Sequence, residues 1–151
     1  MLFLVTKNWQ LSNSVTNIGH GAFEYCADLT SIEIPNSVTY MGDLVFYGCT
    51  SLTAFNIPNS ITSIGVGVFN GCTALASIEI PNTVTSILED AFSNCSSLTS
   101  IEVHWDNPIS IIPDVFREIL LSEITLYVPV GTVDKYKFAD VWKEFNIVEQ
   151  Q

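Results

Sequence analysis

The sequence predicts a β-rich α+β solenoid, a right-handed superhelix of about five coils with a parallel β-sheet and a helical C-terminal cap. Three observations support this prediction. Segment 80–92 recurs 23 residues earlier as 57–69 and again, more loosely, as 34–46. The four cysteines follow one another at the same 23-residue interval. Each repeat also carries an Ile-x-Ile or Ile-x-Val pair or a close variant, and this alternation is typical of a β-strand. A fixed period of this length indicates stacked coils.

The N-terminal segment, residues 1–11, reads as the last part of a preceding coil, because Trp9 and Gln10 align with Ile32 and Glu33 one period later. We therefore expect further repeats or another domain before Met1. The apolar run 2–5 is too short for a secretion signal, so either the chain is cytoplasmic or, as we expect, the signal also lies before Met1. The solenoid is expected to occupy 1–131, as a partial coil and five repeats. Residues 132–151 are expected to form the cap of the same domain.

Apolar residues recur in fixed columns within the repeats. The inward columns are Val15, Val38, Ile61 and Val84; Ile18, Met41, Ile64 and Ile87; Phe23, Phe46, Phe69 and Phe92; Leu29, Leu52, Leu75 and Leu98; Ile32, Phe55, Ile78 and Ile101; and Ile34, Ile57, Ile80 and Val103. The last two columns predict strands that pair with their equivalents in the next coil, about 4.8 Å away. A proline ends each strand because it has no backbone donor. Val-Thr-x-Ile predicts a second short extended segment.

The remaining parts of the repeat predict its corners. Gly19, Gly42 and Gly65 are expected to turn the chain, and the Phe-x-x-Cys piece to form one turn of helix. In the fifth repeat His104 replaces the proline and a different corner follows. Residues 134–144 then carry Tyr136, Phe138, Val141, Trp142 and, just beyond, Phe145 near helical spacing, which predicts the cap. Ile147 and Val148 are expected to add a final strand.

The cysteines Cys26, Cys49, Cys72 and Cys95 occupy one inward column. The repeat predicts a buried ladder of reduced thiols, since a small, weakly polar side chain packs well there. Disulfides remain an alternative. A zinc site is a further one, although no CxxC motif or nearby histidine supplies the other ligands.

Charge excludes some partners. The net charge is −11, and no Lys or Arg occurs between Asn8 and Phe116. An acidic chain repels nucleic acid and anionic membrane surfaces. No apolar run approaches the roughly 18–20 residues that span a bilayer, so membrane insertion is not expected.

The sequence contains no recognisable catalytic motif. His20 and His104 are the two histidines, and both fall at corners, where packing or solvation explains them. The serines are turn residues without a nucleophile elbow, and there is no phosphate loop or HExxH motif. Asp43, Glu89, Asp90 and Asp114 are too sparse for the six to eight oxygens of a Ca²⁺ site. We expect no catalytic residue, no metal ligand and no cofactor.

The outward position between the two strand residues is the best candidate for function. It holds Glu33, Asn56, Glu79, Glu102 and Tyr127 in successive coils. Glu79 and Glu102 are expected about 5 Å apart, and glycosidases use paired carboxylates. A solvated polar surface, a ligand-binding surface and a catalytic pair remain open, although a flat repeated surface lacks the pocket that catalysis needs.

Segments 26–46 and 72–92 share the pattern Cys-x-x-Leu-x-x-Ile-x-Ile-Pro-x-x-Val, followed by an aliphatic residue and then Val-Phe or Ala-Phe. This pattern resembles the BspA-type leucine-rich repeats, a variant of about 23 residues. The tail 126–132, with Tyr136 and Trp142, looks like the closing segment of such proteins from Bacteroides-like bacteria. The resemblance implies a leucine-rich-repeat superhelix in a secreted or surface-attached protein, some of whose relatives mediate adhesion or bind host matrix proteins.

The expected function is therefore non-enzymatic protein binding or adhesion at a cell surface or outside the cell. The partner would be a host matrix or surface protein with basic patches. A structural spacer, or an accessory domain of a larger enzyme, remain alternatives.

Overall fold

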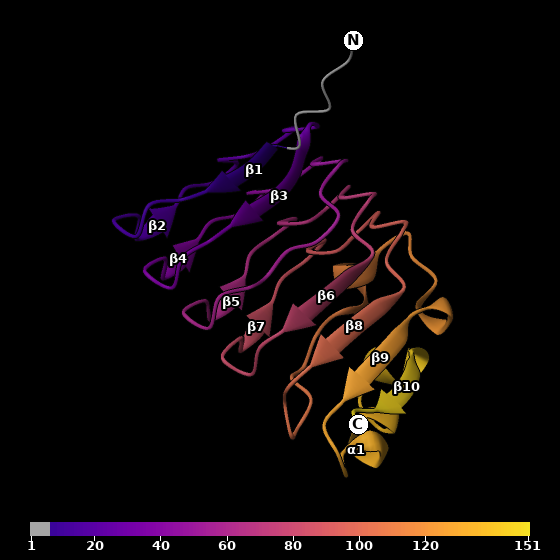
Figure 1. Ribbon diagram of the computed structural model, residues 1–151. Helices are drawn as coiled ribbons and strands as arrows, with labels where there is room; N and C mark the ends of the chain where they lie inside the picture. Colours follow the sequence, from indigo (N-terminus) through magenta and orange to yellow (C-terminus); the bar gives the residue numbers. More distant parts are fainter. Residues whose placement is uncertain (1–6) are drawn as a thin grey trace.

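The computed structural model describes residues 7–151 as a stack of coils whose strands lie side by side along one face (Figure 1). The strands are β1 (Lys7–Gln10), β2 (Asn17–Ile18), β3 (Leu29–Glu33), β4 (Tyr40–Met41), β5 (Ser63–Ile64), β6 (Ser77–Ile80), β7 (Ser86–Ile87), β8 (Ser100–Val103), β9 (Thr125–Val128) and β10 (Asn146–Glu149). The helical segments are the 3₁₀ helices η1 (Pro113–Phe116), η2 (Leu121–Glu123) and η3 (Trp142–Glu144), and the α-helix α1 (Val133–Lys137).

The predicted parallel ladder is present but divided. β1 pairs with β3, and β6, β8, β9 and β10 form a four-stranded parallel sheet. In the coil between these sheets a single bridge joins Asn56 to Glu79. The expectation of a paired strand in every coil is therefore wrong there. The break falls at Phe55, whose ring lies 4.9 Å from that of Phe46 and 5.0 Å from that of Phe69 and needs more room than the isoleucine of other coils.

The second extended segment is confirmed. β2 pairs in parallel with β4, and β5 pairs in parallel with β7. The alignment of the N-terminal segment is also confirmed for the described residues, because Trp9 pairs with Ile32 and Gln10 with Glu33. The expectations for residues 1–6 lie outside the described residues.

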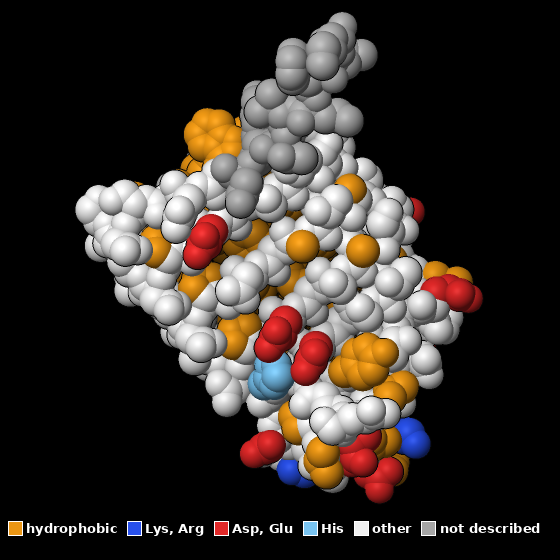
Figure 2. Space-filling model, in the orientation of Figure 1, with side chains coloured by type: hydrophobic (Ala, Val, Ile, Leu, Met, Phe, Trp, Pro, Cys, Tyr) orange, Lys and Arg blue, Asp and Glu red, His pale blue; other side chains and the backbone are white. Residues whose placement is uncertain are grey.

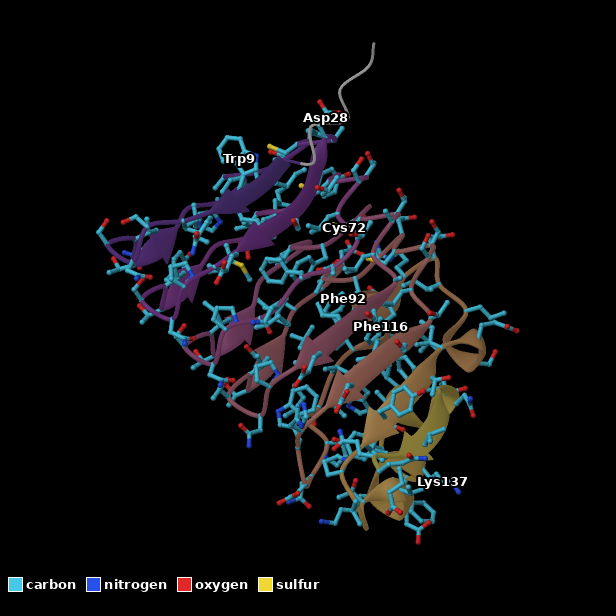
Figure 3. All side chains as sticks on the ribbon, viewed as in Figure 1. Trp9, Asp28, Cys72, Phe92, Phe116 and Lys137 are labelled. Carbon is cyan, nitrogen blue, oxygen red and sulfur yellow. The ribbon has the colours of Figure 1, made fainter. Side chains whose placement is uncertain are left out.

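Stacked phenylalanines form the centre of the core. Neighbouring rings lie 5.4–5.7 Å apart and within 13° of parallel, in the order Phe23, Phe46, Phe69, Phe92 and Phe116. Figure 3 shows Phe92, Phe116 and Cys72 inside the stack. Backbone bonds hold the same column, since the amides of Phe46 and Phe69 donate to the next coil at 2.9 and 2.8 Å. The expected helical turn is wrong for the first four repeats, which have hydrogen-bonded turns here; η1 supplies a 3₁₀ helix in the fifth.

The cysteine column is buried from Cys49 onward, as predicted, but Cys26 is exposed, which corrects the prediction for the first coil. All four are free thiols. Each buried thiol donates to the phenylalanine carbonyl of the preceding coil, over 3.1–3.2 Å. Burial raises the pKa of Cys49 to about 11 and that of Cys95 to about 12.

The predicted turn glycines have another role. Gly42 and Gly65 are buried and have no left-handed φ, and a Cβ on Gly42 would lie 2.8 Å from the backbone nitrogen of His20. They allow one coil to approach the next. Left-handed conformations fall instead at two other columns of each coil, for example at Gly67 (φ 61°) and Gly71 (φ 75°), where glycine costs least.

The C-terminal segment contains less helix than predicted. α1 ends at Lys137, η3 follows, and Phe138 is 86% exposed instead of packed. Trp142 is fully buried against Phe116, and Phe145 contacts the same ring at 5.2 Å. The predicted final strand is confirmed as β10, which pairs with β9.

Candidate functional site

The outward positions of the strands lie on one surface, which we call the sheet face and define by Glu33, Asn56, Glu79, Glu102 and Tyr127. Each lies between two buried residues; Ile78 and Ile80, for example, point into the core on either side of Glu79. Strand alternation causes this arrangement, because successive side chains point to opposite sides of a sheet.

Four of the five predicted residues are direct neighbours. Asn56 bridges to Glu79, Glu79 lies opposite Glu102, and Glu102 lies opposite Tyr127. Glu33 belongs to the smaller sheet, where it pairs with Gln10. The sheet face is therefore one row with a step between its first and second members.

His104 is a member of this surface that the sequence interpretation missed. Its Nε2 lies 2.7 Å from Glu79 Oε1 and 3.9 Å from Glu102 Oε1. An ionised carboxylate only accepts hydrogen bonds, so the ring donates to Glu79. In Figure 2 two acidic side chains lie beside a histidine on this face. The alternation that places Glu102 outward and Val103 inward also places His104 outward, and that signal could have identified it.

His20 is a corner residue, as predicted. Its Nδ1 accepts the backbone N–H of Asp43 at 2.9 Å, and Asp43 Oδ1 accepts that of Val66 at 2.8 Å. A polar acceptor at this position thus binds the equivalent amide of the next coil. His20 contributes to coil stacking and lies outside the sheet face.

Two shallow polar grooves run beside the sheet face, where the strands end. One has a volume of about 200 Å³ and is lined by Asn36, Asn56, Ile57, Pro58, Asn59, Glu79 and Pro81. The other, about 410 Å³, shares Asn36, Asn56 and Pro58 and extends past Glu33 to Gln10. The amide and carboxylate groups offer acceptors and donors to a ligand lying along the stack.

A third depression of about 450 Å³ lies at the other end of the row. It is lined by Glu102, Tyr127, Val148, Glu149, Gln150 and Gln151. A more apolar hollow of about 310 Å³, lined by Trp9, Phe23 and Tyr25 among others, lies at the N-terminal end and contains none of the predicted site residues.

The described part of the chain contains no group of three or more His, Cys, Asp or Glu side chains placed to hold a metal ion. Within residues 7–151, no helix is both long enough and apolar enough to cross a bilayer. The sheet face offers hydrogen-bonding groups, negative charge and one aromatic ring.

Comparison with solved structures finds proteins of similar fold. A leucine-rich cell surface protein from Faecalibacterium prausnitzii is 29% identical with a TM-score of 0.65. The match covers 95% of this chain and 32% of the Faecalibacterium chain. A leucine-rich repeat protein from Bacteroides ovatus is 27% identical with a TM-score of 0.66. The match covers 85% of this chain and 40% of the Bacteroides chain. The pneumococcal vaccine antigen PcpA shares the fold, with 16% identity and a TM-score of 0.74. The match covers 96% of this chain and 42% of the PcpA chain.

The chain thus spans less than half the length of each of these three proteins. No curated protein matches its sequence. The family model of the BspA type leucine-rich repeat region matches residues 5–116 in six copies. With a leucine-rich-repeat fold of parallel strands and few helices, the chain belongs to the BspA-type leucine-rich repeat family.

Proposed function

We propose that the chain is a non-enzymatic protein-binding or adhesion module and that the sheet face contacts the partner. The row of exposed or partly exposed side chains from Glu33 to Tyr127, which differ among the coils, carries this proposal. The inward columns keep the same residue types from coil to coil because they form the core. The outward position varies between carboxylate, amide and phenol, so the scaffold does not dictate it.

Charge supports a partner with basic patches. Three of the five side chains in the row are carboxylates, and the sequence before Arg117 contains no Lys or Arg other than Lys7. Complementary charges accelerate encounter and select partners. Exposed charges are screened by salt beyond about 8–10 Å, so the association should weaken as ionic strength rises.

We place the module at a cell surface or outside the cell, and the similarity to a cell surface protein of Faecalibacterium prausnitzii supports this placement. In this proposal residues 1–131 form the binding solenoid and residues 132–151 close it. The partner would be a matrix or surface protein of a host.

A charge-neutralised variant tests the sheet face. Glu33→Gln, Glu79→Gln and Glu102→Gln remove three negative charges without changing side-chain size. Binding to an immobilised panel of extracellular matrix proteins should fall with this variant. The matched control is Glu24→Gln, Asp28→Asn and Glu118→Gln, which removes three exposed charges away from the row.

Equal binding by the variant and the wild type would contradict the proposal. It would favour the second candidate, a structural spacer that holds another domain away from the cell surface. An accessory domain of a larger enzyme is the third, and a catalytic domain elsewhere in the full-length gene would identify it.

A further inference from the structure

Tyr127 differs from the other members of the sheet face because it is aromatic and only partly covered. It lies in β9 with Glu102 opposite on one side and Val148 opposite on the other. The side chain is 38% exposed, so one part of the ring is held by its neighbours while the remainder faces solvent.

The depression beside this ring is bounded by fixed groups. Gln150 Nε2 donates to the Val103 carbonyl at 2.9 Å, and the Gln150 amide donates to the Val128 carbonyl at 2.9 Å. Glu149 Oε1 accepts the amide of Gly131. These bonds fix the far wall of the depression, so its volume of about 450 Å³ is defined by the fold.

The charges around the depression select the class of ligand. Glu102 lines it directly, Glu79 lies in the next coil, and the residues that line it include no Lys or Arg. His104 donates to Glu79, while its distance to Glu102 Oε1 is 3.9 Å. The contact with Glu102 is longer than a hydrogen bond, so the Glu102 carboxylate can still accept a hydrogen bond from a ligand on the side of Tyr127.

An aromatic ring next to a carboxylate suits a planar cation. A guanidinium stacks on an aromatic ring and donates two parallel hydrogen bonds to a carboxylate, whereas an ammonium is a compact, strongly hydrated charge. A cation over an exposed ring gains about 0.5–1 kcal/mol. Both requirements are met where Glu102 and Tyr127 face each other across neighbouring strands.

We propose that the depression at Tyr127 is an arginine-binding subsite, in which the guanidinium of a partner's arginine stacks on the Tyr127 ring and pairs with Glu102. The inference rests on the proposed function, since it names the anchor by which a basic partner holds the sheet face. The remainder of the row, Glu33, Asn56 and Glu79, contributes charge and hydrogen bonds without preference between arginine and lysine.

The test compares peptides that differ in one side-chain type. A fluorescent arginine-rich peptide, a lysine peptide of the same length and spacing, and a citrulline peptide are titrated with the protein, and anisotropy gives each affinity. The wild type should bind the arginine peptide about two- to fivefold more tightly than the lysine peptide. The uncharged citrulline peptide should bind far more weakly than either.

Tyr127→Leu should abolish the preference for arginine and retain binding of the lysine peptide. Tyr40→Leu is the matched control, because Tyr40 is also a partly exposed tyrosine but lies outside the sheet face, and it should retain the preference. Equal affinity of the wild type for the arginine and lysine peptides would overturn the subsite alone, whereas tight binding of the uncharged citrulline peptide would overturn both the subsite and recognition by charge. Absence of binding by every peptide would overturn both the subsite and the proposed basic partner.

Discussion

His104 donates a hydrogen bond from Nε2 to Glu79 Oε1 over 2.7 Å, between two neighbouring coils of the sheet face. The histidine side chain is 33% exposed and the glutamate 61%. One of the carboxylates on this surface is therefore already engaged within the protein. A cationic partner has to compete with the imidazole for Glu79, whereas Glu33 and Glu102 are more available.

Removing the imidazole should strengthen binding of cations. In His104→Ala the Glu79 carboxylate loses its internal donor, so affinity for an oligolysine peptide should rise roughly two- to fivefold, the scale of one exposed charge pair. The direction is the same whether the ring is neutral or protonated, because loss of a positive charge also favours a cation. Isothermal titration calorimetry at low salt measures the effect.

His20→Ala is the control for this prediction. That histidine lies at the corner and accepts the Asp43 amide, away from the sheet face. Its loss should leave oligolysine affinity unchanged. Weaker binding in His104→Ala would mean that the ring itself contacts the ligand.

The cysteine column predicts selective labelling. Cys26 is exposed, whereas Cys49, Cys72 and Cys95 are buried and donate to carbonyls of the preceding coil. The thiolate is the reactive form, and burial raises the pKa of all three buried thiols. At pH 8 an alkylating reagent should rapidly modify Cys26 alone in the native protein, and all four after denaturation, as intact mass spectrometry would show. Cys26→Ser should remove the fast reaction; rapid labelling that persists in this variant would refute the buried column.

The same thiols predict loss of stability in alkali. Burial raises the pKa of Cys49 from its ordinary 9.0 to about 11 and that of Cys95 to about 12. The unfolded chain therefore loses these protons at lower pH than the native chain. The contribution of these thiols to the free energy of unfolding is fully present below pH 9. It is lost as the pH rises through their pKa values in the native protein. Urea midpoints should be level between pH 7 and 8.5 and fall from pH 9 to 11, with a shallower fall in Cys95→Ala. A fall of equal steepness in Cys95→Ala would contradict this origin.

The sequence predicted the parts of the fold that depend on repetition. The Phe column, the Cys column from Cys49 onward and the parallel register of Glu79 with Glu102 follow from a fixed period, since equivalent residues must stack. The break in the sheet did not follow from that period. It depends on how a single larger side chain, Phe55, fits between Phe46 and Phe69, and such packing is a tertiary property.

The candidate site divides in the same way. Strand alternation placed Glu33, Glu79, Glu102 and Tyr127 outward, and the structure has them there. The hydrogen bond from His104 to Glu79 joins side chains of neighbouring coils, and its formation depends on side-chain conformations that a repeat pattern does not specify. The exposure of Phe138 was also beyond pattern analysis, because the helical spacing of 134–144 gave no sign that α1 would end at Lys137.

The glycine column allows a matched test of coil stacking. Gly19 and Gly42 occupy the same position in adjacent coils, but a Cβ on Gly42 would lie 2.8 Å from the His20 nitrogen, while a Cβ on Gly19 would meet nothing within 4 Å. Neither has a left-handed φ, so a difference between them is steric. Gly42→Ala should lower the free energy of unfolding by about 1–3 kcal/mol, as for an overpacked core, and Gly19→Ala should change it by less than about 0.5 kcal/mol. Urea denaturation of both variants measures this difference. Equal losses of stability in the two variants would contradict this explanation. They would mean that the close approach of the His20 backbone is not the reason for glycine at position 42.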